Sequence, residues 1–181
     1  DYTVINANGD ELEIRRPPPT HTRLRWHLLF ANPLAHSSVL YRRDDVLACG
    51  GYETETPYAQ DYRLWVRMTG RVRSAGVREC LTRYRIHPDS IGNRKRTEQL
   101  HYHLETMRVM SEPYLNRQMS IEEAKNLYRV SHRVPVKSLR DCARTTELLE
   151  RLQASFLCVE SVSSEERQWI VKDTLRMQHE L

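Results

Sequence analysis

The segment PYAQDYRLWVRM, residues 57–68, carries a single carboxylate, Asp61, at the front of an amphipathic stretch. The segment CGGYE lies shortly before it and contains the adjacent glycines Gly50 and Gly51. A carboxylate in such a position can cap the first turn of a helix, or it can act as a catalytic base if it lies in a cleft. On the residues alone capping is the simpler interpretation, and both roles require a helix that begins near residue 61.

The amphipathic pattern predicts that helix from residue 61 to about residue 69, with Leu64, Trp65 and Met68 on one face and Gly70 at its end. At this spacing Trp65 is expected in the core. The segment RDDVLACGG, residues 43–51, predicts one or two helical turns that a glycine stops. The glycine pair can form that stop and a turn, and it can also let a ligand approach the backbone closely, so both roles stay open.

The segments around these helices predict a mixed α/β arrangement. Alternating residues in YTVINANGDELEI predict a hairpin that turns at Asn8-Gly9-Asp10, before a stiff connector of three prolines. RLRWHLLF, residues 23–30, is expected to form a short helix that Thr20 or Thr22 caps and that ends before Asn32-Pro33. Strands are predicted in HSSVLYR, residues 36–42, and in VRECLTRYRIH, residues 77–87, with a turn in HPDSIGN, residues 87–93.

From residue 94 onward the pattern becomes helical. Ser120 with Glu123, and Ser163 with Glu166, predict capping boxes at two helix starts. Apolar residues recur at helical spacing in three stretches: Leu100, Leu104 and Met107; Leu139, Cys142, Ala143, Thr146, Leu149, Leu152 and Phe156; and Ile170, Met177 and Leu181. Such stripes could form a partner-binding surface, but helices that pack on each other and on the first part of the chain are the simpler interpretation.

Composition narrows the class of protein. The chain is 39% hydrophobic and 29% charged, and no apolar run approaches the length of a membrane span. The formal charge of +4 suits an anionic ligand such as a diphosphate, an acidic lipid surface or nucleic acid, and does not choose between them. The four cysteines are scattered, which argues against a zinc site or a disulfide framework and indicates a reducing compartment. The chain begins with Asp1 rather than Met, so we expect a segment to have been removed from its start.

Five short motifs then follow in one order between residues 32 and 92: NPLAH, SVLYRR, GGYE, AQDYRLWVR and YRIH. This series resembles the carboxyl-terminal half of the catalytic domain of family-two glycosyltransferases of the GT-A fold. Members of that family typically carry Asn-Pro-x-x-His, Ser-Val-x-x-Arg-Arg, Gly-Gly-Tyr-Asp-Glu, Ala-Glu-Asp-Tyr-Asp-Leu-Trp-x-Arg and Tyr-Arg-x-His. The resemblance implies an α/β fold class: a partial GT-A domain over residues 1–93 that lacks its amino-terminal nucleotide-binding half, followed by an all-helical extension over residues 94–181.

The resemblance also implies that Asp61 is the general base of an inverting sugar transfer. An acceptor hydroxyl must lose its proton as it attacks the anomeric carbon, so an ionised group is needed on the face opposite the leaving nucleotide diphosphate. The helix dipole favours an ionised carboxylate at this position. By the same resemblance Gly50, Gly51, Tyr52 and Gln60 line the acceptor site.

Arg85 and His87 sit where the family's last strand turns toward the diphosphate. Arginine can clamp phosphate oxygens with two parallel hydrogen bonds, and His87 could contact the diphosphate or its bound metal. A histidine before proline is also an ordinary turn residue, so that reading of His87 stays open. His36 and Asn32 fit buried polar contacts better than ligand contacts.

The chain departs from the family pattern at three positions near the acceptor. Gln60 stands where the family usually has Glu, Arg63 where it often has Asp, and Glu53 where Asp follows Gly-Gly-Tyr. Gln60 removes a charge next to the base without removing the base itself. The acceptor's identity therefore stays open.

GT-A enzymes bind the nucleotide through an amino-terminal βαβ half and hold Mg²⁺ or Mn²⁺ with an Asp-x-Asp motif. The 181 residues contain neither. We expect the intact enzyme to use a divalent metal through an upstream motif, and His87 is the one candidate metal contact in this chain. Residues 1–181 alone are expected to show little or no transferase activity, and tight binding of a uridine-diphosphate sugar would contradict this.

The implied partners are a nucleotide-diphosphate sugar donor and a saccharide or lipid-linked acceptor, in bacterial cell-surface polysaccharide or glycolipid synthesis. The implied location is the cytoplasm, with peripheral contact at the inner face of the membrane. The alternative is a non-catalytic helical interaction module with a degenerate transferase remnant. Gln60 and the missing metal motif favour that alternative, whereas Asp61 and YRIH oppose it. Nucleic-acid binding is not expected, because the arginines are spread along the chain and few aromatic residues interleave with them.

Overall fold

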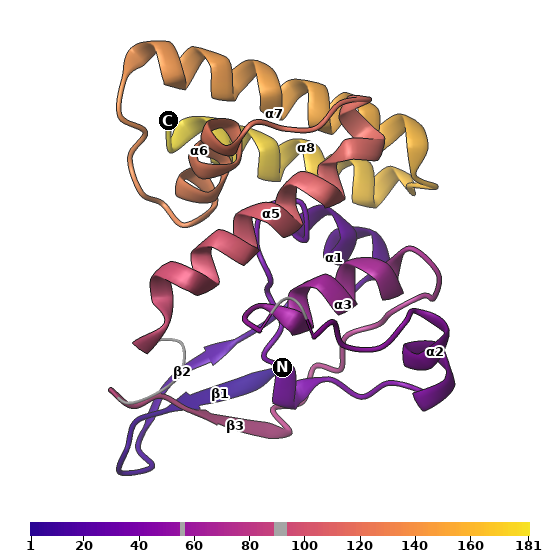
Figure 1. The fold of residues 1–181 in the computed structure, drawn as a ribbon, viewed down its shortest axis with the longest axis vertical. Coiled ribbons are helices and arrows are strands. Elements are labelled where there is room, and N and C mark those ends of the chain that lie inside the picture. Colours follow the sequence, from indigo (N-terminus) through magenta and orange to yellow (C-terminus); the bar gives the residue numbers. More distant parts are fainter. Residues whose placement is uncertain (55–56, 89–93) are drawn as a thin grey trace. The chain divides into compact units, whose positions relative to one another are not determined.

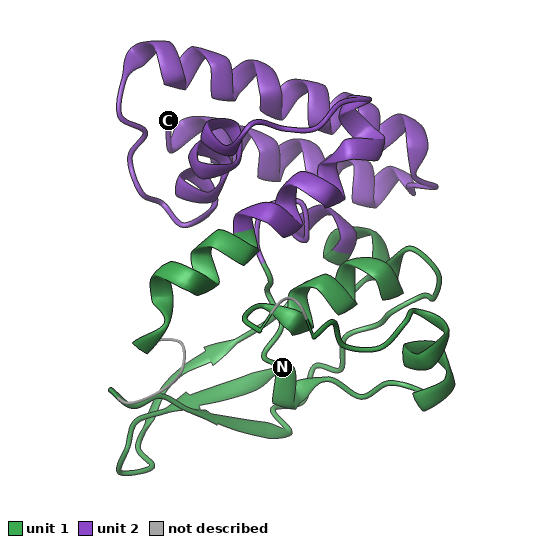
Figure 2. Ribbon diagram, in the orientation of Figure 1, with its two compact units in different colours: residues 1–24, 32–103 green, residues 25–31, 104–181 purple. Residues whose placement is uncertain are grey.

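The structure is a computed structural model, and it describes residues 1–54, 57–88 and 94–181 (Figure 1). The chain divides into two compact units, each built from separate stretches of sequence (Figure 2). Unit 1 comprises residues 1–24 and 32–103, and unit 2 comprises residues 25–31 and 104–181. The helices α1 (His21–His27) and α5 (Arg96–Leu115) therefore each contribute residues to both units.

Unit 1 contains a three-stranded sheet in the order β2-β1-β3. The central strand β1 (Tyr2–Ile5) is buried throughout, pairs antiparallel with β2 (Glu11–Arg15) and pairs parallel with β3 (Thr82–Arg85). The predicted hairpin is therefore confirmed, and its turn is closed by the side-chain oxygen of Asn6, which accepts hydrogen bonds from two backbone amides beyond it. The strand predicted over residues 77–87 is confirmed only for Thr82–Arg85, in the second half of that range.

The two helices predicted around the glycine pair are present in unit 1. Helix α2 (Arg43–Ala48) ends before Gly50, whose φ of +85° suits a residue without a side chain. Helix α3 (Gln60–Thr69) buries its predicted apolar face of Leu64, Trp65 and Met68. The short helix α1 is also confirmed, with the Thr20 hydroxyl oxygen accepting from a backbone amide in its first turn.

The strand predicted over residues 36–42 is wrong. The segment begins with a 3₁₀ turn, η1 (His36–Ser38), and continues without regular structure to residue 42. Both the amide and the hydroxyl of Ser38 donate to the carbonyl of Ala35, which closes the turn. The ring contacts of His36 and Tyr41 with residues on other segments explain the aromatic content that resembled a strand, because these side chains serve tertiary contacts rather than a pleated surface.

The described part of residues 94–181 is helical, as predicted. Unit 2 contains most of α5, then α6 (Ile121–Ser131), α7 (Leu139–Val159) and α8 (Ser164–His179). Residues 25–31 belong to this unit, and the ring of Trp26 packs edge-on against Phe156 of α7. No helix within the described ranges is both long enough and apolar enough to span a bilayer.

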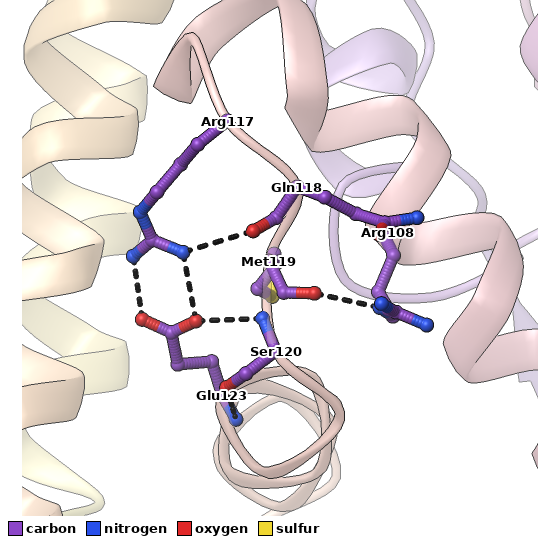
Figure 3. Close-up of polar contacts among 6 residues, drawn as sticks. All are labelled: Arg108, Arg117, Gln118, Met119, Ser120 and Glu123. Carbon is purple, nitrogen blue, oxygen red and sulfur yellow. Dashed lines mark hydrogen bonds and ion pairs between the residues drawn. The ribbon is translucent and has the colours of Figure 1, made fainter.

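The capping box at the start of α6 is confirmed in full (Figure 3). The Ser120 hydroxyl accepts from the Glu123 amide, and the Glu123 carboxylate accepts from the Ser120 amide at 2.7 Å. Arg117 forms two parallel hydrogen bonds with the same carboxylate, and these bonds lower the pKa of Glu123 to about 2. At the start of α8 the Ser163 hydroxyl likewise accepts from the Glu166 amide.

The apolar stripe on α7 is confirmed in its second half. Leu149, Leu152 and Phe156 are fully buried, whereas Leu139 is 89% exposed. The buried face is completed by Thr145 and Leu148 rather than by Ala143 and Thr146. At 3.6 residues per turn, positions 139, 143 and 146 fall on other sides of the helix, so the stripe as predicted was too wide.

Candidate functional site

Asp61 lies half-buried in the first turn of α3. Its Oδ1 accepts a hydrogen bond from the Tyr62 amide at 2.8 Å, and its Oδ2 accepts one from Asn32 Nδ2 at 3.0 Å. The amide oxygen of Asn32 in turn accepts from the Leu34 amide at 3.1 Å. The carboxylate is thus fixed at both oxygens, and each oxygen retains capacity for one further proton donor.

The residue at the N-cap of α3 is Ala59 rather than Asp61. Ala59 makes no side-chain cap and adopts the left-handed conformation, with φ 60° and ψ 26°. This conformation costs about 1–2 kcal/mol for a residue with a Cβ, and such strain is typically found at functional sites. Gln60 follows as the first helical residue and is half-buried.

Tyr52 belongs to a cluster of polar aromatic residues near Asp61. Its hydroxyl lies 2.8 Å from His36 Nε2 and 3.3 Å from the Tyr41 hydroxyl. Burial raises the pKa of Tyr52, and the hydrogen bond to Tyr41 and the charge of Asp61 raise it further. The phenol therefore stays protonated near neutral pH and can both donate and accept a hydrogen bond.

Trp65 packs against two members of this cluster, His36 and Tyr41. Its ring is 3% exposed and lies 5.9 Å from the rings of both His36 and Tyr41. The expectation that Trp65 is a core residue is confirmed by its burial. Its Nε1 is buried and, within the part of the chain that the structure describes, has no hydrogen-bond partner. A buried donor without an acceptor costs about 1–3 kcal/mol, which is unusual in a native structure.

Gly50 and Gly51 form the loop between α2 and Tyr52. Both have positive φ, +85° and +67°, so the backbone itself requires glycine here. A Cβ added at either position would meet no other atom within 4 Å among the residues that the structure describes. The turn role of the pair is therefore visible in the backbone, and the space in front of the glycines is open.

Three residues of this region, Glu53, Arg63 and Arg67, form an ion-pair cluster that the sequence did not predict. Glu53 forms ion pairs with Arg67 and, at 3.0 Å, with Arg63, both on α3. Arg67 also donates to backbone carbonyls of the glycine loop. The sequence signal was present in the spacing of Arg63 and Arg67, which places both on one side of a helix, but their partner could not be identified from the sequence.

The structure places Arg85 at the end of β3, where it is exposed and donates to the carbonyls of Asn6 and Ala7 at 3.1 and 2.7 Å. His87 follows two residues later and is exposed. No hydrogen bond joins Arg85 to the Asp61 cluster in the described ranges, although β3 contacts η1, which carries His36. The turn predicted over residues 87–93 lies largely outside the described residues.

A metal ligand set is not evident in unit 1 or unit 2. Among the residues that the structure describes, no group of three His, Cys, Asp or Glu side chains is placed to hold a metal ion. His87 would therefore need ligands from elsewhere, so the residues described here do not by themselves fit a divalent metal.

A polar groove of about 410 Å³ lies in unit 2 between the start of α6 and α7. Arginines and carboxylates line the groove, and several of them already form ion pairs within the chain. Arg117 pairs with Glu123, and Glu122 pairs with Lys125 outside the groove lining. The groove contains none of the predicted site residues. The candidate site is therefore not this groove. It is the group of residues around Asp61 in unit 1, which we call the Asp61 cluster: Asn32, His36, Tyr41, Tyr52, Asp61 and Trp65.

Two known glycosyltransferases are similar to the chain in sequence. The chain is 33% identical over 94 residues to the O-antigen biosynthesis glycosyltransferase WbnJ of Escherichia coli, which covers 48% of this chain and 35% of that protein. It is 26% identical over 92 residues to the amylovoran biosynthesis glycosyltransferase AmsE of Erwinia amylovora, covering 50% and 34%. The chain thus spans about a third of the length of these relatives. No family model and no solved structure matches it.

Proposed function

We propose that residues 1–93 are the acceptor-side half of an inverting family-two glycosyltransferase of the GT-A fold, with residues 94–181 as its helical extension. The intact enzyme transfers a sugar from a nucleotide-diphosphate donor to a saccharide or lipid-linked acceptor. Two similar proteins are named for O-antigen and amylovoran biosynthesis, which supports a role in cell-surface polysaccharide synthesis. The net charge of +4 is consistent with peripheral contact at the cytoplasmic face of the membrane.

The observation that carries this proposal is the hydrogen bond of 3.0 Å between Asn32 and Asp61. It joins the first and the fourth of the five ordered motifs, which lie 29 residues apart in the chain. Because the Asn32 amide oxygen is also held by the backbone, the side chain presents its NH₂ group to the carboxylate. The two motifs therefore meet at one carboxylate, and the contact holds that carboxylate in one orientation, which supports its role as a positioned base.

In the proposed reaction the acceptor hydroxyl gives its proton to the Asp61 carboxylate as its oxygen bonds to the anomeric carbon. The bond from that carbon to the diphosphate oxygen breaks, and the diphosphate leaves with the electron pair. The Tyr62 amide and Asn32 orient the carboxylate through one hydrogen bond each. Tyr52, kept neutral, offers a hydroxyl to the acceptor sugar, and the open space before Gly50 and Gly51 admits it.

Arg85 is proposed to face the diphosphate together with His87. To do so, the Arg85 guanidinium must exchange the carbonyls of Asn6 and Ala7 for phosphate oxygens, which bind it more strongly. A divalent metal is proposed for the intact enzyme, with ligands outside the residues described here. No step above depends on that metal.

The test is Asp61→Asn in the intact protein, with donor and acceptor varied separately. General-base catalysis typically contributes 10²–10⁴-fold, so kcat is expected to fall by about that factor while the circular dichroism spectrum is unchanged. Asp44→Asn is the matched control, because Asp44 holds the second helical position of α2 as Asp61 does in α3. Unchanged turnover by the Asp61 variant would overturn the assignment. Absence of any turnover in the intact wild-type protein would favour a non-catalytic interaction module, an alternative that Gln60 supports.

A further inference from the structure

The guanidinium of Arg67 binds the loop after α2 at three points. Its Nε donates to the carbonyl of Cys49 at 3.1 Å, its Nη2 donates to the carbonyl of Gly51, and its Nη1 pairs with the Glu53 carboxylate. Three nitrogens of one side chain thus engage three acceptors within residues 49–53. Arginine presents its donors in a fixed planar fork, whereas lysine offers a single charge on a flexible stem.

Two further arginines, Arg63 and Arg71, bind the same loop. Arg63, one turn earlier, pairs with the second oxygen of Glu53 at 3.0 Å. Arg71, just beyond the end of α3, donates to the carbonyl of Ala48 at 2.7 Å. Residues four apart lie on the same side of a helix, so Arg63 and Arg67 bind residues 49–53 from one side of α3.

The contacts of Arg67 lie on both sides of Tyr52, at the Gly51 carbonyl and at the Glu53 carboxylate. Two consecutive glycines with positive φ cannot fix the direction of the next side chain by themselves, because glycine has the widest conformational freedom. Arg67 and Asp61 stand on the same helix. The guanidinium therefore links the residues on both sides of Tyr52 to the helix that carries Asp61.

We infer that Arg67, together with Glu53, is a positioning residue that holds Tyr52 in register with Asp61 and so determines how the acceptor is bound. This inference rests on the proposed function, in which Tyr52 lines the acceptor site. It also explains why two departures from the family pattern, Glu53 and Arg63, occur together. Glu53, longer than Asp, reaches both Arg63 and Arg67, whereas an Asp at position 63 would repel it.

The test is Arg67→Lys in the intact protein, read out in two independent ways. Hydrogen–deuterium exchange of the backbone amides of residues 48–54 is expected to speed up at least tenfold, because two carbonyls lose their donor. The acceptor KM is expected to rise about tenfold or more while the donor KM is unchanged, since small displacements at a reacting site have large kinetic effects. A general loss of stability would change both KM values or neither.

Arg71→Lys is the matched control, because Arg71 has the same side chain four residues later and, among the residues that the structure describes, its side chain donates only to the Ala48 carbonyl. Its acceptor KM is expected to stay within twofold of wild type. The double variant Glu53→Arg with Arg67→Glu restores a charge pair but leaves the Cys49 and Gly51 carbonyls without a donor, so it is expected to behave like Arg67→Lys. Recovery of normal exchange and KM in that variant would overturn the positioning role.

The two readouts separate this inference from the proposed function. Unchanged loop exchange and acceptor KM in Arg67→Lys would overturn the inference while wild-type turnover still supports the function. Faster loop exchange with an unchanged acceptor KM would also overturn it. Faster loop exchange in a protein whose wild type has no turnover would confirm that Arg67 holds the loop and contradict the transferase.

Discussion

Units 1 and 2 are stabilised in different ways. In unit 2 the helices bury Trp26, Leu149, Leu152 and Phe156 completely, and each helix start that follows a serine cap has its hydroxyl bonded to a backbone amide. Around Asp61 in unit 1, by contrast, side chains hold segments that have no regular structure. Regular packing stabilises unit 2, whereas a small number of polar contacts determines the geometry of the candidate site.

The two most buried tryptophans show the difference most directly. In unit 2 the Trp26 indole donates to Asp173 at 2.9 Å, so its polar atom is satisfied. In unit 1 the Trp65 indole nitrogen is buried without a partner among the described residues. Ala59, close by in sequence, is held in a left-handed conformation. Unsatisfied groups and strained backbone together are expected where function rather than stability has selected the residues.

Unit 2 also contains a pair of half-buried charges, Arg25 and Glu160. The Arg25 Nη2 lies 2.7 Å from a Glu160 oxygen and 2.8 Å from the Tyr114 hydroxyl, which itself donates to Glu160. Residues 25–31 thus bring both a charge network and large apolar side chains into unit 2. The segment that leads directly into Asn32 of the candidate site is consequently part of the helical core.

The largest expected effect follows from this segment. Truncation to residues 1–103 removes the helices against which Trp26, Leu28, Leu29 and Phe30 are buried. Each such side chain contributes about 1.5–3 kcal/mol, and the sum is comparable with the whole stability of a small domain. We expect the fragment to show no cooperative urea transition by circular dichroism, while residues 1–181 unfold cooperatively.

A cooperative transition of the fragment would show that unit 1 folds without unit 2. The same experiment on residues 1–93 tests the boundary proposed between the transferase half and the helical extension. If that shorter fragment folds, the helices are an appendage. If it does not, they are part of what holds the site together.

The sequence predicted regular structure well because periodic patterns and caps are local. The capping box of Ser120 and the buried face of α3 depend on residues three or four positions apart, and both are present. The contacts that build the candidate site have no such period. Asn32 meets Asp61 across 29 residues and His36 meets Tyr52 across 16, so only tertiary structure brings them together.

The strand wrongly predicted over residues 36–42 has the same cause. Its aromatic and β-branched residues have high strand propensity, whereas in the structure His36 and Tyr41 contact Tyr52 and Trp65. Propensity assigns no shared role to Asp61 and the glycine loop, whereas the resemblance to a family predicts that both belong to the acceptor site. The resemblance assigned no role to Arg67, the last residue of the fourth motif, because the partners of Arg67 are mostly backbone carbonyls, which residue types do not reveal.

The carboxylate of Glu123 at the start of α6 is expected to make the stability of unit 2 depend on pH. The Arg117 contact holds the pKa of Glu123 at about 2 in the folded chain, against 4.5 for the free side chain. Because the folded pKa is the lower one, this contribution to stability is present above about pH 4.5 and is lost as the pH falls toward 2. Glu123→Gln is expected to cost about 1 kcal/mol of unfolding free energy at pH 7 and nothing below pH 2.

Glu122→Gln is the control for this measurement, because Glu122 stands next to Glu123 in the same helical turn and is mostly exposed. Its unfolding free energy is expected to stay within about 0.5 kcal/mol of wild type. Urea unfolding at several pH values checks both variants. A pH-independent difference between wild type and Glu123→Gln would mean that the capping geometry, and not the ionised carboxylate, stabilises α6.

The smallest expected effect is at Ala59 and has the opposite sign. Glycine adopts φ of +60° without the Cβ clash that alanine meets, so Ala59→Gly is expected to stabilise unit 1 by up to about 1 kcal/mol after the entropy of glycine is counted. Ala48→Gly, at the end of α2 in ordinary helical backbone, is the same substitution and is expected to destabilise by about 0.5–1 kcal/mol. Urea unfolding of the two variants measures whether the backbone at Ala59 is strained. Changes of opposite sign in the free energy of unfolding would show that strain is stored beside Asp61. A loss of stability in both variants would show that the left-handed conformation costs nothing. If Ala59→Gly also lowers turnover in the intact protein, the strain contributes to the direction in which α3 presents its carboxylate.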